Sequence, residues 1–160
     1  MLHSNAQAVD RAGGMNGPRW LVLTWRLPSS SSTARVATWR SLQRLGAVML
    51  TPGAVILPYS EHLLEQLEWT AEDIVQRGGD AYVLPVTELP EADEEQIRRR
   101  MREERQVEYR RIRDAAEKSV RNERELAALR RGLARVVERD HFASSGRNAA
   151  ERAIKRAAKE

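Results

Sequence analysis

The sequence Trp20-Leu-Val-Leu-Thr-Trp-Arg-Leu-Pro28 opens the stretch that decides the fold, residues 19–90. Residues 19–27 are mostly apolar, β-branched or aromatic and are closed by a proline, which predicts a β-strand. Serine and threonine at 29–33 supply N-cap candidates for a helix over residues 34–45, and Gly46 is expected to end that helix.

The second half of this stretch departs from a simple alternation of strands and helices. Two short apolar runs, 47–50 and 54–57, flank Thr51-Pro52-Gly53 and predict a β-hairpin. An amphipathic helix is expected over 60–77, and residues 81–86 predict a last strand. The order βαββαβ is that of the ferredoxin-like fold, so we expect an α+β protein with a ferredoxin-like domain over residues 19–90.

Residues 91–160 predict a helical extension with long charged helices. Between 91 and 139 there is no proline and Gly132 is the only glycine, while leucine, alanine, arginine and glutamate dominate. We expect one long helix, or a hairpin that turns within 118–123, followed by a short basic helix over 148–159. Phe142 is expected to anchor the break between them onto the core. The predicted apolar stripe comprises Ile97, Met101, Val107, Ile112 and Val120, then Leu126, Leu129, Leu133 and Val136.

Composition limits the cellular setting. The 160 residues contain no cysteine, which excludes disulfides and thiolate metal sites. No apolar run approaches the roughly 20 residues that a membrane span needs. Residues 1–18 lack the hydrophobic region of a signal peptide and predict a disordered leader. We therefore expect a cytoplasmic protein without a membrane contact.

The net charge of +4 is unevenly distributed along the chain. Residues 19–90 carry six basic and seven acidic side chains, whereas residues 91–160 carry twenty basic and fifteen acidic ones. The positive charge of the helical extension favours an anionic partner such as DNA at low salt. A solvated helix surface with interleaved charges explains the same run, and the sequence leaves both explanations open.

Several segments form a recognisable set: residues 20–28, Arg35-Val-Ala-Thr-Trp-Arg-Ser-Leu-Gln-Arg-Leu-Gly46, Val55-Ile-Leu-Pro58, Trp69, Gly78-Gly79 and Arg139-Asp-His-Phe142. Together they resemble the N-terminal domain of the chromate-resistance regulator family ChrB, over roughly residues 19–158. The resemblance implies a DNA-binding transcriptional regulator that controls a chromate-efflux operon and releases DNA when chromate appears. Relatives carry a further C-terminal domain credited with sensing, so we expect a stand-alone N-terminal domain that lacks it.

Four arginines are the candidate site residues. Arg26 ends the first predicted strand, and Arg35, Arg40 and Arg44 project from the helix after it. The planar guanidinium group of arginine binds two oxygens at once, and backbone amides at a helix N-terminus attract anions. We expect this region to bind an oxyanion, either a DNA phosphate or chromate. The alternative is that these are surface arginines, some of them paired with Glu61, Glu65 or Glu68.

Catalytic and cofactor-binding patterns are absent from the sequence. The end of the first strand carries no carboxylate for a nuclease metal, and the serines at 29–32 have no recognisable histidine base. His62 and His141 lack a second ligand at metal-binding spacing. We therefore expect no enzyme activity, no cofactor and no metal.

A second function stays open beside DNA binding. The edges of a four-stranded sheet and a long amphipathic helix both favour a homodimer, so the chain is alternatively a non-enzymatic dimeric interaction module with a coiled-coil-like arm. Trp20 and Trp25 are five positions apart and should lie on opposite faces of the sheet. We expect all four tryptophans to serve in the core or in docking rather than as base-stacking platforms.

Overall fold

The computed structural model describes residues 17–118, 120 and 122–159. The predicted disordered leader falls outside the described residues for positions 1–16, so it stays a prediction.

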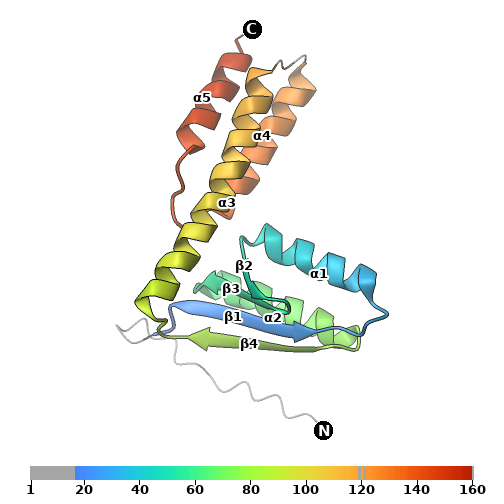
Figure 1. The fold of residues 1–160 in the computed structure, drawn as a ribbon. Helices are drawn as coiled ribbons and strands as arrows, with labels where there is room; N and C mark the ends of the chain where they lie inside the picture. The colour runs from blue at the N-terminus through green and yellow to red at the C-terminus, as the bar shows by residue number, and fades with distance from the viewer. Residues whose placement is uncertain (1–16, 119, 121, 160) are drawn as a thin grey trace.

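Over the described residues, four antiparallel strands form a sheet of order β2-β3-β1-β4 (Figure 1). Central β1 pairs with both of its neighbours, through Leu21 and Leu57 on one side and through Leu21 and Pro85 on the other. This order, with a helix after β1 and after β3, is ferredoxin-like and confirms the predicted α+β fold class. The strands are β1 Trp20–Arg26, β2 Val48–Thr51, β3 Ala54–Pro58 and β4 Asp80–Val86.

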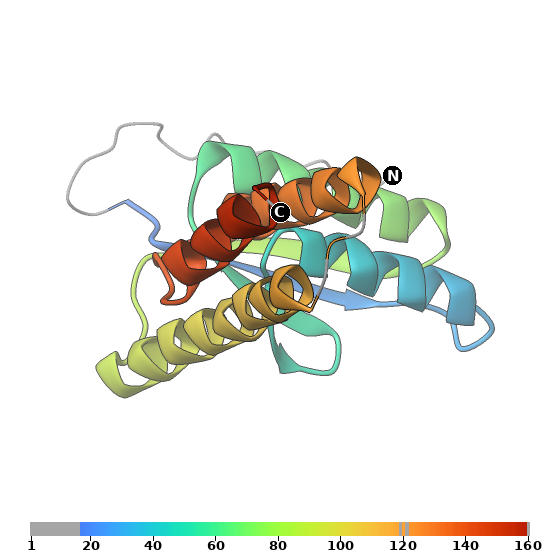
Figure 2. The same ribbon diagram turned by 90° about the horizontal axis from the view of Figure 1, so that it is seen from above.

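Two helices, α1 Ser32–Arg44 and α2 Glu61–Gln76, cover one face of the sheet (Figure 2). The Ser60 hydroxyl accepts a hydrogen bond of 3.1 Å from the Leu63 amide and so caps the start of α2. As predicted, Gly46 follows the end of α1, and it adopts a φ of +81° that favours glycine. The fully buried side chains between the helices and the sheet are Leu21, Leu23, Leu42, Val55, Leu57, Leu67 and Ile74.

Within the part of the chain that the structure describes, the other face of the sheet is covered at one end. There Trp20, Val48 and Ile56 pack against Ile97 and Met101 near the start of α3, Glu91–Glu117. Trp25 packs in the core on the helix-covered face, so the prediction that Trp20 and Trp25 lie on opposite faces is confirmed.

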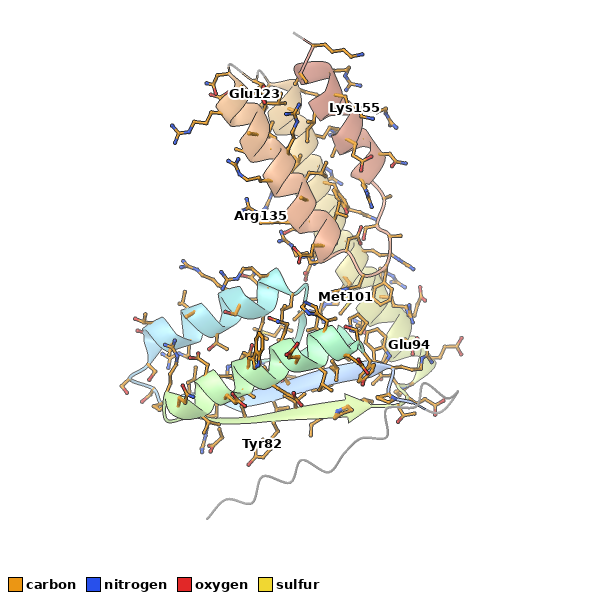
Figure 3. The ribbon with its side chains drawn as sticks, turned by 180° about the vertical axis from the view of Figure 1, so that it is seen from behind. Tyr82, Glu94, Met101, Glu123, Arg135 and Lys155 are labelled. Carbon is orange, nitrogen blue, oxygen red and sulfur yellow. The ribbon has the colours of Figure 1, made fainter. Side chains whose placement is uncertain are left out.

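No described residue covers the rest of that second face. The side chains of Tyr82 and Leu84 are 66% and 47% exposed, and Figure 3 shows Tyr82 projecting from the sheet on the side away from the helices.

The C-terminal helices form a three-helix bundle that projects from one end of the sheet (Figure 1). Helices α4, Glu123–Glu138, and α5, Arg147–Ala157, pack against α3. Because α3 ends at Glu117 and α4 begins at Glu123, the chain adopts the hairpin, one of the two alternatives that the sequence left open. Asn122 caps α4, since its side-chain oxygen accepts from the Glu125 amide at 2.9 Å.

The predicted apolar stripe of α3 is wrong at Val107, which is 41% exposed. The buried line instead advances one turn at a time through Met101, Arg105 and Tyr109. Residues four apart share a helix face, whereas position 107 lies six residues beyond Met101, well round the helix from that line. The charged residue Arg105 therefore occupies a core-facing position of α3, whereas a prediction from hydrophobicity places the apolar residue Val107 there.

Candidate functional site

Two of the four predicted site residues lie apart from the other two. Arg26, at the exposed end of β1, donates a hydrogen bond of 2.6 Å to the Asp80 carboxylate. Arg35, in the first turns of α1, donates to the carbonyl oxygens of Pro28 and Ser29 and so helps to close the loop between β1 and α1. Over the described residues, none of the four arginines pairs with Glu61, Glu65 or Glu68, the partners that the alternative interpretation expects.

The other two, Arg40 and Arg44, line a cleft of about 430 Å³ between α1 and the bundle. Arg105 from α3 and Arg139 at the end of α4 line the same cleft. Within the described part of the chain, Arg40 has no ion pair, and Arg44 donates only to the Ser41 hydroxyl at 3.1 Å. We call this the arginine cleft, because it gathers guanidinium groups from Arg40, Arg44, Arg105 and Arg139.

Arg105 is the buried member of the arginine cleft, with only 6% of its surface exposed. Its Nη2 donates to Glu104 at 3.3 Å, and its Nε lies 2.7 Å from a Glu108 oxygen, close enough for an ion pair although not aligned as a hydrogen bond. No described residue accepts a hydrogen bond from its Nη1. Glu108 also accepts two hydrogen bonds from Arg139. Four guanidinium groups therefore face two carboxylates, and burial raises the pKa of the Glu104 carboxyl.

The segment after α4, residues 139–142, joins the bundle to the rest of the fold, and we call it the joining loop. Its Asp140 carboxylate accepts hydrogen bonds from the Tyr109 hydroxyl at 2.9 Å and from both the amide and hydroxyl of Ser144. Burial and this hydrogen bond to Asp140 raise the pKa of the Tyr109 hydroxyl. These contacts fix the end of α4 against the middle of α3.

Phe142 and His141 attach the joining loop to the ferredoxin-like part. The Phe142 ring lies 6.0 Å from the Trp20 ring and 4.5 Å from the Arg98 guanidinium carbon, so the expected anchor on the core is confirmed. His141 Nε2 lies 2.7 Å from the Leu45 carbonyl oxygen and must donate there, because a carbonyl only accepts. The imidazole is thereby held at the C-terminal end of α1.

The pKa of His141 is lowered, first because the imidazole is buried and also because Arg105 is near. As the pH falls below the ordinary value of 6.5, the unfolded chain takes up this proton before the folded protein does. The stability that neutral His141 contributes is thus complete above 6.5 and declines as the pH falls towards the lowered value. We expect the difference in unfolding free energy between the native protein and His141→Gln to shrink from about pH 7.5 to about pH 5.5 in urea titrations. A difference that stays constant across this range would contradict the assignment.

A row of exposed arginines runs along α4. Arg124, Arg131 and Arg135 are separated by seven and four residues and so share one face of the helix. Over the described residues none of the three forms an ion pair. Figure 3 shows Arg135 on the side of α4 that turns towards the angle between the bundle and α1. This row and the arginine cleft therefore border the same concave region.

The sequence pointed to Arg40 and Arg44 but not to Arg105 or Arg139 as site residues. The available signal for Arg105 was its position on the line of Ile97, Met101 and Tyr109, where an arginine must be buried and needs an anionic partner. Arg139 opens the segment Arg139-Asp-His-Phe142, which belongs to the family resemblance, but that segment by itself gave no sign that Arg139 lies in a site with Arg40 and Arg44.

Other classes of site find no support in the described part of the chain. There, no group of three or more histidine, aspartate or glutamate side chains lies close enough to hold a metal ion. None of its helices is both long enough and apolar enough to cross a membrane.

By fold and site this is an α+β protein in which a ferredoxin-like sheet, a three-helix bundle and an arginine-lined cleft are combined. A sequence model described as "Protein ChrB, N-terminal" matches residues 35–120, which is over half of the chain. The chain belongs to this family of ChrB N-terminal domains.

A curated relative, Protein ChrB of Cupriavidus metallidurans, is 37% identical over 79 residues. The matched segment covers 49% of this chain and 24% of the relative, so the likeness spans about a quarter of that protein's length. No solved structure matches the chain.

Proposed function

We propose that this protein is a DNA-binding transcriptional regulator of the chromate-resistance type, which acts on a chromate-efflux operon and catalyses no reaction. Family membership supports the regulatory class. The observation that carries DNA binding is the concave region bordered by Arg40 and Arg44 on α1 and by the arginine row on α4. Their guanidinium groups, without ion pairs among the described residues, are available to phosphates.

The dimensions of this surface suit a nucleic-acid backbone. Arg124 and Arg135 are eleven residues apart, which is about 16 Å along a helix and spans several phosphates of one strand. Arg40 and Arg44 lie on α1, so α4 and α1 contact a duplex from two directions. The described residues show no conventional recognition helix-turn-helix, and the contacts proposed here go to the backbone rather than to base edges.

The test is binding to the promoter DNA beside the protein's own gene, measured by fluorescence anisotropy across a salt series. Arg131→Ala combined with Arg135→Ala should weaken binding and make the plot of log K against log salt shallower by about 0.9 for each phosphate that the variant no longer neutralises. Arg152→Ala combined with Lys155→Ala removes the same charge from α5, on the far side of the bundle (Figure 3), and should leave the slope unchanged.

Equal weakening in the two double variants would show that only net charge matters and would contradict the proposed surface. Adding chromate to the same titrations tests the operon assignment, because release of DNA by chromate is expected of a regulator of this type. Absence of binding beyond that to random DNA, together with a concentration-dependent dimer in sedimentation velocity, would favour the dimeric interaction module. The observation that supports this second function is the exposure of Tyr82 and Leu84 on the sheet face that α1 and α2 do not cover.

A further inference from the structure

A groove of about 720 Å³ lies between α1 and α2, the two helices on the sheet (Figure 2), and the joining loop borders it. Its volume falls within the range of small-molecule sites. It is larger than the arginine cleft, with which it shares Arg44 and Arg139 at the common border. We call it the α1–α2 groove. Its lining includes Thr38 and Ser41 from α1 and Gln66, Trp69 and Thr70 from α2.

Trp69 gives the α1–α2 groove an aromatic surface. This residue is 57% exposed, although tryptophans in folded proteins are buried over most of their surface. It lies three positions after Gln66 and four before Asp73, so the three side chains share one face of α2. Within the described part of the chain, no aromatic ring and no cation packs against the indole. The exposure excludes a core role for Trp69 and leaves its ring available to a planar partner.

Two polar groups of the α1–α2 groove have no partner among the described residues. The side-chain amide of Gln66, which is half-buried, forms no hydrogen bond there. Thr38 is 3% exposed, and its hydroxyl is likewise unpartnered. A threonine inside a helix can donate its hydroxyl to the carbonyl four residues earlier, as Thr70 does to Gln66 at 2.9 Å, but Thr38 does not. Because buried polar groups are usually hydrogen-bonded, the groove suits a ligand with polar edges.

The charges of the α1–α2 groove favour an uncharged ligand. Two arginines and two carboxylates line it, so their formal charges cancel: Arg44, Arg139, Asp73 and Glu138. The wall formed by α2 is acidic, because residues 61–76 contain four glutamates and one aspartate but no lysine or arginine. A phosphate or sulfate placed against Trp69 would face this acidic helix, whereas a neutral molecule meets no such repulsion.

We propose that the α1–α2 groove binds a neutral nucleobase of the adenine type. The base stacks on Trp69, since the flat face of a base packs on an aromatic side chain. The amide of Gln66, one turn before Trp69, offers a donor and an acceptor together, which is how glutamine pairs with the N6 and N7 atoms of adenine. A purely apolar ligand would leave this amide and the Thr38 hydroxyl without partners. The same chemistry is available in a free nucleoside and in an unpaired base of a nucleic-acid strand.

The test is isothermal titration calorimetry of the full chain with adenosine, and ribose is the reference because it has the sugar without the base. We expect saturable binding of adenosine and none of ribose. Failure of adenosine to bind, or equal heats with ribose, would overturn the proposal. A single-stranded oligodeoxyadenylate, titrated at high salt to suppress backbone contacts, distinguishes the sources. Tighter binding of the oligonucleotide than of adenosine would identify a base within a strand, and equal or weaker binding would identify a free nucleoside.

Variants of exposed residues on α2 test the contact with Trp69. Trp69→Ala should weaken adenosine binding at least about fivefold because the stacking surface is lost. Trp69→Phe keeps a ring and should restore most of the binding. Val75→Ala is the matched control, since Val75 is 52% exposed on the same helix but does not line the groove, and it should leave binding unchanged. Equal weakening in Trp69→Ala and Val75→Ala would overturn the proposal.

Thr38→Val separates binding from folding. Valine has nearly the shape of threonine without the hydroxyl, and removing a buried hydroxyl that has no partner should leave the urea midpoint unchanged or raise it. Adenosine binding should weaken in the same variant. A lower urea midpoint with unchanged adenosine binding would show that the hydroxyl serves the fold and would overturn its part in the site. Because the adenosine titrations contain no DNA, their result is independent of the proposed regulatory function.

Discussion

Gly46→Val should lower the free energy of unfolding by about 3 kcal/mol, because two separate penalties meet at this position. The φ of +81° is a left-handed conformation that a β-branched residue adopts only under strain. The first added carbon would lie 2.7 Å from the Arg139 carbonyl oxygen and about as close to His141 Nε2, at 3.0 Å. The neighbours are backbone and a half-buried ring, so neither can move aside cheaply.

Urea denaturation followed by circular dichroism measures this destabilisation, and Gly132→Ala is the matched control. Gly132 lies inside α4 with no atom within 4 Å of an added carbon. That substitution should stabilise the protein by roughly 0.5–1 kcal/mol, since alanine is the better helix former. A destabilisation by Gly46→Val of less than about 1 kcal/mol would mean that the turn after α1 does not press against the joining loop as described.

Glu108→Ala is expected to cost about 2–3 kcal/mol, the second large effect. Glu108 is the carboxylate that bridges Arg105 and Arg139, whose side chains are 7% and 17% exposed. Removing it leaves the guanidinium group of Arg139 without its ion-pair partner and leaves Arg105 with only the 3.3 Å contact to Glu104, which is the costly way to break a buried ion pair. The effect should appear as a lower urea midpoint with an unchanged m-value.

Glu104→Ala, one turn earlier on α3, is the control for Glu108→Ala. The Glu104 side chain is 47% exposed and its contact with Arg105 is long, so its removal should change stability by less than about 1 kcal/mol. Equal effects for the two glutamates would indicate that general charge balance, rather than the bridge from Glu108, stabilises this region.

Much of the fold follows from local patterns in the sequence. The strands and the first two helices are short, regular and separated by glycine, proline or serine, so each begins and ends within a few residues of its predicted bounds. The hairpin of α3 and α4 was one of two open alternatives, because no glycine or proline marks the turn before Asn122. The capping residue Asn122 is a weak local signal for the start of α4, and it is decisive only together with the packing of α4 against α3.

The arrangement of the site depends on packing that no local pattern encodes. Arg40 and Arg44 were predictable as exposed arginines one turn apart, but Arg105 and Arg139, which share their cleft, lie 65 and 99 positions beyond Arg40 in the chain. The prediction missed Arg105 because the apolar residue Val107, two positions further along, was assigned to the predicted stripe. The burial of Arg105 depends on its ion pair with Glu108, so hydrophobicity alone predicts the wrong buried face of α3.

The joining loop gives the protein a mechanical lever. It ties the base of α4 to the end of α1, while the 16 residues of α4 extend about 24 Å from that fulcrum to Glu123. A tilt of about 10° at the fulcrum therefore carries the tip of α4 through roughly 4 Å, close to the spacing of successive nucleotides in a DNA strand. On the proposed DNA-binding function, such a tilt would shift the position at which the arginines of α4 meet the strand by about one nucleotide.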